Sequence, residues 1–275
     1  MSPINTISID KLARLIGTPK CPVLIDVQTD EDFAADPRLI PGAVRRPWSQ
    51  ASEWATEFVG QSAIVICQKG QKLSEGVAAW LRHEGIPADS LEGGALAWAQ
   101  ADLPMVPEIV LPPRDAQGRT VWVTRARPKV DRIACPWLIR RFIDPNAEFL
   151  YVPTDQVFAS AKREGAVAYD IPGVPFSHEG EACSFDAFLR RFELEDEPGL
   201  RILAPIIRGA DTDRHDLAPE AAGLHAISLG LAASHEDDHL LLSHGMAVYD
   251  ALYAWATQAH GERHDWRPPR ARTLA

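Results

Sequence analysis

Cys67 begins a short loop whose composition suits sulfur chemistry. Residues 67–72 read CQKGQK and lie between an apolar stretch and a helical pattern. In such a loop, main-chain N–H groups can surround the sulfur, and the N-terminus of the next helix lies behind it. Both features favour the thiolate, as do the charges of Lys69 and Lys72, and Gly70 permits the tight turn. We therefore expect an accessible nucleophile at Cys67, with a buried structural cysteine as the alternative.

Three arginines in the second half are candidates for binding an oxyanion. Arg132 and Arg140 lie about two turns apart on a predicted amphipathic helix, close to one face, and could hold a tetrahedral anion. Asp131 is the expected N-cap of this helix. Arg208 supplies a further cation in a later polar turn. The alternative is that these arginines are ordinary exposed residues.

A loop that contains His178 is a candidate for binding a metal. His178 and Cys183 flank two glutamates before a helix that we expect Ser184 to cap, and Asp211 lies in the later turn over residues 208–214. Such side chains bind borderline divalent metals such as zinc, iron or manganese. Many loop histidines bind no metal, so an unliganded His178 is the alternative.

The composition excludes several classes of protein. The 275 residues are 46% apolar and 24% charged, which is typical of a globular chain of about two domains. A net charge of −10 argues against a broad nucleic-acid surface. No stretch approaches the roughly 18 apolar residues of a membrane helix, and the start does not resemble a secretion signal. Four widely spaced cysteines favour reduced thiols, so we expect a cytoplasmic protein.

The hydrophobic pattern changes character near the middle of the chain. Before residue 105, short β-branched runs alternate with helical patterns, which predicts an α/β domain with a parallel sheet flanked by helices. A proline-rich stretch then predicts a linker over residues 107–118. The remainder predicts an α+β, mostly helical domain, followed by a loose tail over residues 258–275. The predicted strands are 22–27, 62–66, 120–124, 148–152 and 166–171, and the predicted helices are 30–35, 73–83, 132–143, 154–163, 185–192, 200–209, 219–232 and 235–256.

Residues 1–106 resemble the rhodanese family of sulfurtransferases. The resemblance implies that Cys67 carries sulfane sulfur as a persulfide, without a cofactor. It also implies that Lys69, Gly70 and Lys72 bind a small anionic donor such as thiosulfate, and that a thiol or cyanide accepts the sulfur. The matching segments, in the family's order, are Leu24-Ile25-Asp26-Val27, Glu31-Asp32-Phe33, Ile40-Pro41-Gly42-Ala43, the loop from Cys67, Leu91-Glu92-Gly93-Gly94, Trp98 and Leu103-Pro104.

Residues 119–257 resemble the C-terminal domain of the chromate-resistance proteins of the ChrB type. The resemblance implies a role in the bacterial response to chromate, but a family label does not define a reaction. The matching stretches are 130–145, 178–185, 207–217, 220–224 and 246–255.

The leading hypothesis is a sulfurtransferase that uses Cys67 and is fused to a domain that binds an oxyanion or a metal. One alternative is a chromate-responsive sensor or binding protein in which the rhodanese part is vestigial. Another is a metal-dependent redox activity in the second domain. Chromate itself is a candidate partner under each of these hypotheses.

Overall fold

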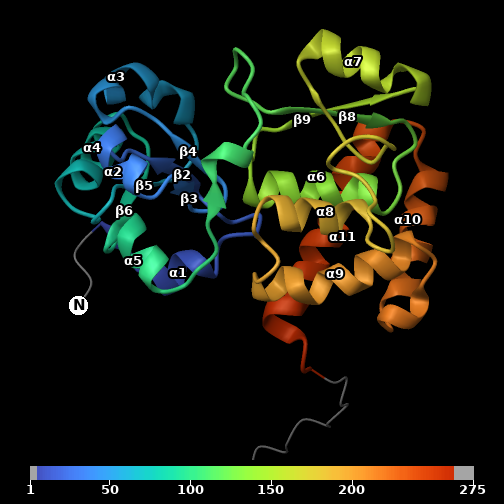
Figure 1. The fold of residues 1–275 in the computed structure, drawn as a ribbon. Coiled ribbons are helices and arrows are strands. Elements are labelled where there is room, and N and C mark those ends of the chain that lie inside the picture. Colours follow the sequence, from blue (N-terminus) through green and yellow to red (C-terminus); the bar gives the residue numbers. More distant parts are fainter. Residues whose placement is uncertain (1–4, 263–275) are drawn as a thin grey trace, which may run out of the picture.

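The computed structural model describes residues 5–262, which form two parts joined by a short segment (Figure 1). In the first part, strands alternate with helices as the hydrophobic pattern predicts. Its elements are β1 (Thr6–Ile7), α1 (Ile9–Ala13), β2 (Val23–Asp26), α2 (Asp30–Ala35), β3 (Arg38–Leu39), β4 (Ala43–Arg45), η1 (Trp48–Gln50), α3 (Ala51–Trp54), η2 (Ala55–Phe58), β5 (Ala63–Ile66), α4 (Lys72–His83), β6 (Ala88–Leu91), α5 (Gly94–Gln100) and β7 (Val106–Pro107).

A five-stranded parallel sheet forms the centre of the first part, with the strand order β1-β6-β5-β2-β4. The central strands β2 and β5 are apolar at consecutive positions because helices cover both faces of the sheet. Ile64 and Ile66 face the core that includes α1 and α5, whereas Val65 faces the core of α3 and α4. The predicted α/β class is confirmed. Because the strands are parallel, their carboxyl ends lie on the same side of the sheet, and Cys67 follows β5 there.

The predicted linker over residues 107–118 is held in place by strand pairing at one end and by an ion pair further along. Its first residue, Pro107, belongs to β7, which pairs with β3 in the first part. A 3₁₀ turn, η3 (Glu108–Val110), follows. Arg114 then forms an ion pair of 3.1 Å with the buried Asp144 of the second part. These contacts fix the segment to both parts of the molecule.

The second part has a small parallel sheet, ordered β10-β8-β9, beneath which most of the helices pack (Figure 1). Its mostly helical character is confirmed. Its elements are β8 (Val121–Arg125), α6 (Asp131–Phe142), β9 (Glu148–Val152), η4 (Thr154–Gln156), α7 (Val157–Glu164), β10 (Val167–Ala168), α8 (Ser184–Arg191), α9 (Pro198–Asp211), η5 (His215–Leu217), α10 (Ala221–Ser234), α11 (Asp238–Ala254) and the π-helical turn η6 (Trp255–Ala259).

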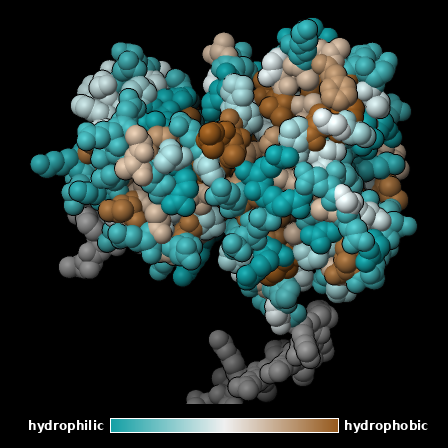
Figure 2. All heavy atoms as spheres, in the orientation of Figure 1, coloured by the Kyte–Doolittle hydropathy of each residue, from teal (hydrophilic) through white to brown (hydrophobic). Residues whose placement is uncertain are grey.

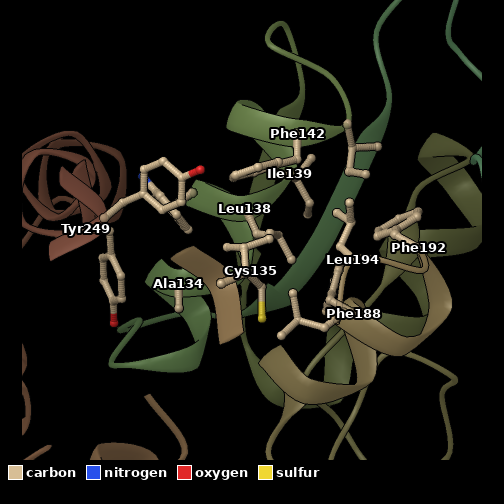
Figure 3. Close-up of a cluster of buried hydrophobic side chains, with 14 of the residues drawn as sticks. Ala134, Cys135, Leu138, Ile139, Phe142, Phe188, Phe192, Leu194 and Tyr249 are labelled. Atoms are coloured by element: carbon tan, nitrogen blue, oxygen red, sulfur yellow. The ribbon is translucent and has the colours of Figure 1, made fainter. Parts of the chain in front are cut away.

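Helix α6 is the core of the second part. The helix predicted over residues 132–143 is present, but its predicted amphipathic character is wrong. It is buried on nearly every side because α8, α9 and α11 all pack on it, and Figure 3 shows the apolar side chains that meet there. Pro136 interrupts α6, and its missing N–H leaves the Arg132 carbonyl without the usual helical donor. The Tyr151 hydroxyl donates to that carbonyl at 3.3 Å and replaces the lost bond.

The two parts share a hydrophobic core. One continuous cluster of buried side chains runs from α1 and α5 into α6, α9 and α11. Gly17, after α1, lies so close to Phe142 and Tyr253 of the second part that only glycine fits there. The face in Figure 2 is mainly hydrophilic, with an apolar patch where the two parts meet. No described helix is long and apolar enough to cross a membrane.

The predicted loose tail is partly wrong. Gln258 and Ala259 belong to the helical turn η6, which continues α11. The rest of that prediction, from residue 263, lies outside the described residues.

Candidate functional site

Cys67 lies between the end of β5 and the first turn of α4, as the sequence predicts. It is only 5% exposed, and its Sγ lies 3.1 Å from the Ser74 hydroxyl and donates over 3.7 Å to the Gln71 carbonyl. The predicted accessible thiol therefore needs correction, because the Cys67 side chain is buried. The surrounding ring of main-chain N–H groups stays a prediction. The N-terminus of α4 nevertheless lies next to the sulfur, because α4 begins at Lys72 and the Ser74 hydroxyl in its first turn contacts Sγ.

The first turn of α5 holds the loop that carries Cys67. The N–H groups of Ala95 and Leu96 donate to the carbonyls of Cys67 and Gln68 at 3.0 and 2.9 Å. Free N–H groups at a helix N-terminus need such acceptors, and here the loop supplies them. The loop is therefore fixed by main-chain hydrogen bonds.

Glycines allow the loop and α5 to approach each other closely. Gly70 has a φ of 64°, and a Cβ there would collide with the Leu91 carbonyl and with the N–H groups of Gly93 and Gly94. A Cβ at Gly94 would in turn collide with the Cys67 carbonyl. The pair Gly93 and Gly94 at the start of α5 is thus part of the structure that shapes the Cys67 loop.

Two lysines add positive charge around the loop. Lys69 and Lys72 are both exposed. Lys72 also lines a groove of about 390 Å³ together with Trp48 and Trp80. The predicted donor-binding lysines are therefore accessible to a small anion.

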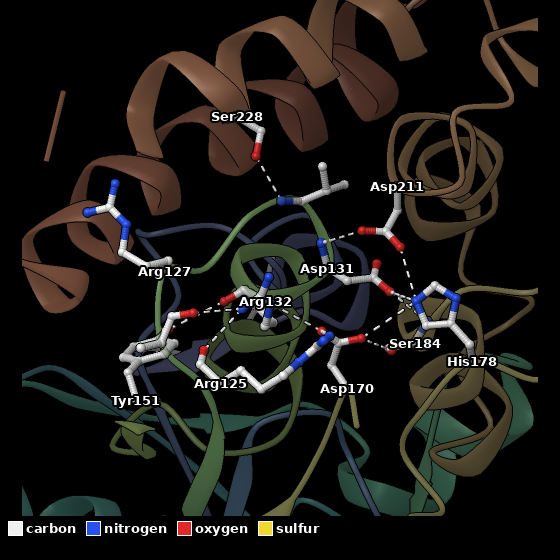
Figure 4. Close-up of polar contacts among 12 residues, drawn as sticks. Arg125, Arg127, Asp131, Arg132, Tyr151, Asp170, His178, Ser184, Asp211 and Ser228 are labelled. Atoms are coloured by element: carbon white, nitrogen blue, oxygen red, sulfur yellow. Dashed lines mark hydrogen bonds and ion pairs between the residues drawn. The ribbon is translucent and has the colours of Figure 1, made fainter. Parts of the chain in front are cut away.

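A second polar cluster lies between segments that are far apart in the sequence of the second part (Figure 4). His178 Nε2 is 3.1 Å from Asp211 Oδ2, 3.5 Å from Asp131 Oδ2 and 3.5 Å from Asp170 Oδ1. Asp131 and Asp170 are buried, Asp211 is partly buried, and the His178 side chain is 41% exposed. We call these four residues the His178 cluster.

Asp131 joins two helices at this cluster. The predicted N-cap role of Asp131 on its own helix is wrong, because Asp131 is the first residue of α6 and Val130 is the N-cap. Its Oδ2 instead accepts the N–H of Ser184, the first residue of α8, at 2.6 Å. Cys183 is the N-cap of α8, so the expected cap at Ser184 is displaced by one residue.

Asp170 is held from several sides. Its φ is 50°, in the left-handed region that non-glycine residues rarely adopt, and such backbone strain clusters at functional sites. Its Oδ2 pairs with Arg125 at 3.0 Å and with Arg132 at 3.2 Å, while its Oδ1 accepts the Ser184 hydroxyl at 2.8 Å. Asp170 therefore presents one fixed oxygen to His178.

Burial and neighbouring charges shift the pKa values within the cluster. Burial, with the negative charges of Asp211 and Asp170, raises the pKa of Asp131 well above its usual value. Burial alone would also raise the pKa of Asp170, but hydrogen bonds from His178 and Ser184 and the charges of the two arginines lower it. Hydrogen bonds to Asp170 and Asp211 raise the pKa of His178 to about 10. The cluster thus binds positive charge strongly.

The structure brings together only two of the three predicted metal ligands. His178 and Asp211 meet in the cluster, but the Cys183 thiol is buried and the Cys183 N–H donates to Asp186 at 2.9 Å. Asp131 and Asp170 also belong to the cluster, although the sequence did not suggest them as candidate ligands. The available signal for Asp170 was a carboxylate at the end of the strand predicted over residues 166–171.

The three predicted oxyanion-binding arginines have different partners. Arg132 pairs with Asp170, and Arg208 makes a two-pronged ion pair with Asp186 at 2.6 and 2.8 Å. Arg140 donates to the Ala147 carbonyl and lies over the Phe149 ring. The structure therefore does not gather them into one anion site.

Residues 8–101 match the rhodanese-like domain family, and residues 122–256 match the ChrB C-terminal domain family. The protein ChrB of Cupriavidus metallidurans is 38% identical over 141 residues, which cover 51% of this chain and 42% of that protein. The chain thus spans less than half of the curated relative that it matches.

Solved structures resemble the first part. A rhodanese-like domain protein from Staphylococcus aureus is 29% identical, with a TM-score of 0.32, over 34% of this chain and 91% of that one. A thiosulfate sulfurtransferase from Pseudomonas aeruginosa is 28% identical, with a TM-score of 0.31, over 38% of this chain and 19% of that one.

Proposed function

We propose that this chain, which joins a rhodanese-like domain to a ChrB C-terminal domain, is a sulfurtransferase that acts in chromate resistance. The observation that carries the proposal is the position of Cys67. Its sulfur lies at the end of a parallel strand and beside the N-terminus of α4, in a loop that α5 holds in place. A helix N-terminus stabilises negative charge, so it favours both a thiolate and a persulfide at this sulfur.

The proposed reaction has two steps that pass one sulfur atom. The Cys67 thiolate attacks the outer sulfur of thiosulfate, a sulfur–sulfur bond forms, and sulfite leaves with the electron pair of the broken bond. Cyanide or a thiolate then attacks the outer sulfur of the persulfide and releases the Cys67 thiolate. Lys69 and Lys72 supply positive charge for the doubly charged donor.

The setting of this reaction is part of the proposal. The four cysteines of the chain are free thiols, which supports a reducing, cytoplasmic compartment. No cofactor is needed for the sulfur transfer, because the cysteine itself carries the group.

A thiosulfate:cyanide sulfurtransferase assay on the full chain tests the proposal. We expect activity in the wild type, at least a hundredfold loss in Cys67→Ser, and little change in the matched control Cys21→Ser. Mass spectrometry after incubation with thiosulfate should show a gain of about 32 Da on the peptide that contains Cys67. Equal rates for the wild type and Cys67→Ser would contradict the proposal and leave the binding-protein alternative.

A chromate-binding role is the second candidate. Calorimetric titration of the full-length Cys67→Ser variant with chromate tests it independently of sulfur transfer. Because Arg132, Arg140 and Arg208 have separate intramolecular partners, the geometry favours a cation over an oxyanion in the second domain.

A further inference from the structure

The His178 cluster contains more carboxylate oxygens that accept hydrogen bonds than the His178 ring nitrogen can donate to. Three carboxylate oxygens lie 3.1–3.5 Å from one atom, His178 Nε2. A ring nitrogen carries at most one hydrogen, which Nε2 shares between Asp170 and Asp211. The Asp131 carboxylate is therefore placed 3.5 Å from the imidazole nitrogen without a hydrogen bond from it.

Asp131 also has a carboxylate oxygen that lacks a hydrogen-bond donor. The residue is 1% exposed, and its Oδ1 is buried without a hydrogen-bond partner among the described residues. Figure 4 shows the Asp131 carboxylate pointing into the space between Asp211 and His178. A buried carboxylate oxygen without a partner is costly, and a bound cation would remove that cost.

We propose that the His178 cluster binds a divalent first-row metal ion, with His178, Asp131 and Asp170 as ligands and Asp211 beside them. The possible ligand atoms of the first three residues all lie within 4.8 Å of one another. Donor atoms around a tetrahedral ion with bonds of about 2.0–2.1 Å lie about 3.3–3.4 Å apart. The distances from Nε2 to the carboxylates are close to that spacing.

The surroundings of the cluster suit a metal site. Ligating carboxylates are usually fixed by a second layer of hydrogen bonds. Here Arg125 and Arg132 hold Asp170 Oδ2, and Ser184 contacts both Asp170 and Asp131 through its hydroxyl and its N–H. The partly exposed His178 leaves a route for an ion from solvent.

The donor set indicates which metals fit. One imidazole and two or three carboxylates suit Mn²⁺, Fe²⁺ and Zn²⁺, whereas a soft, thiolate-preferring metal would need a cysteine. Cys183 is not among the possible ligands, because its thiol is outside the group. Mn²⁺ is therefore a suitable probe, since its spin signal reports binding directly.

Titration of the full chain with Mn²⁺, followed by electron paramagnetic resonance, tests the proposal. We expect one Mn²⁺ per chain, displaced by Zn²⁺, and an affinity at least tenfold lower in His178→Ala. His178 is half-exposed, so this variant should fold, and circular dichroism checks it. Asp131→Asn removes a ligand charge and should weaken binding as strongly.

A second cluster provides the matched control. Asp213, His215 and His225 form the other group of possible ligands among the described residues, and Asp213 and His215 are exposed. We expect His225→Ala to leave Mn²⁺ binding unchanged. Loss of binding in His225→Ala but not in His178→Ala, or no binding of Mn²⁺ or Zn²⁺ by the wild type, would overturn the proposal. Cys67→Ser should bind Mn²⁺ normally, so this result is independent of sulfur transfer.

Discussion

The loop of Cys67 and the His178 cluster differ in what holds them together. Main-chain hydrogen bonds and closely packed glycines fix the Cys67 loop, which occupies consecutive residues between β5 and α4. Side-chain charges fix the His178 cluster, whose members come from α6, α9 and the chain between β10 and α8. A loop built from the main chain tolerates many side-chain changes except at its glycines. A cluster built from charges depends on every one of its side chains.

Alkylation of the cysteines in the two parts should show the largest effect. Burial raises the pKa of Cys21 to about 12 and raises the pKa of Cys135 and Cys183 as well. A thiol with a raised pKa contains less thiolate at a given pH. At pH 8 we therefore expect Cys21 to react with iodoacetamide about a thousandfold more slowly than free cysteine.

Peptide mapping by mass spectrometry measures these rates for each cysteine. Cys67 should be labelled first, and the buried Cys135 and Cys183 last. The protein unfolded in denaturant is the control, since all four thiols should then react alike. Fast labelling of Cys183 in the folded protein would contradict this prediction, because the second part would then also contain a reactive thiol.

Gly70→Ala tests whether main-chain packing controls the Cys67 loop. The added methyl group would collide with the Leu91 carbonyl at a φ that only glycine adopts easily, so the loop must move. A displacement of about 1 Å at a reacting group can cost a hundredfold in rate, and we expect a loss of that size in sulfur transfer. Mn²⁺ binding at the His178 cluster should stay unchanged.

Gly76→Ala is the matched control for that prediction. Gly76 lies in α4, close to the same loop, and has open space where a Cβ would be added. Alanine favours a helix over glycine by about 1 kcal/mol, so this variant should be fully active and slightly more stable. If Gly70→Ala is as active as Gly76→Ala, the loop does not depend on this close contact.

The sequence predicts the local features of the first part well. Helix α2 has the predicted bounds, and α4 starts one residue before the prediction. These segments are specified by short-range signals, namely a side-chain cap at Thr29 and a regular apolar spacing in α4. The main-chain contacts of the Cys67 loop could not be predicted, because they depend on how α5 docks against the loop.

The second part is harder to predict because its site depends on tertiary contacts. A buried helix such as α6 lacks a polar face, so its periodicity does not reveal which residues face the site. Asp131 looks like an ordinary cap in the sequence, and its contact with Ser184 spans 53 residues. The ion pair of Arg208 with Asp186 is likewise a tertiary contact that the sequence does not reveal. His178 and Asp211 were predicted from the sequence, whereas only the structure places Asp131 and Asp170 beside them.

Gly17→Ala asks whether the two parts unfold together. Gly17 belongs to the first part, and a Cβ there would lie 2.6 Å from both Phe142 and Tyr253 of the second part. Because the hydrophobic core is continuous across the junction, we expect one cooperative unfolding transition. Overpacking of this kind costs about 1–3 kcal/mol, in addition to about 1–2 kcal/mol for the left-handed φ.

Gly60→Ala separates these two costs. Gly60 has a φ of 83°, close to the 80° of Gly17, but a Cβ there would meet nothing within 4 Å. Denaturant unfolding followed by tryptophan fluorescence and by loss of Mn²⁺ binding should give coincident transitions for both variants. Gly17→Ala should be less stable than Gly60→Ala by about 2 kcal/mol, the overpacking cost alone. Equal stabilities would mean that the junction yields to the methyl group, and separate transitions would mean that the two differently built parts are also energetically independent.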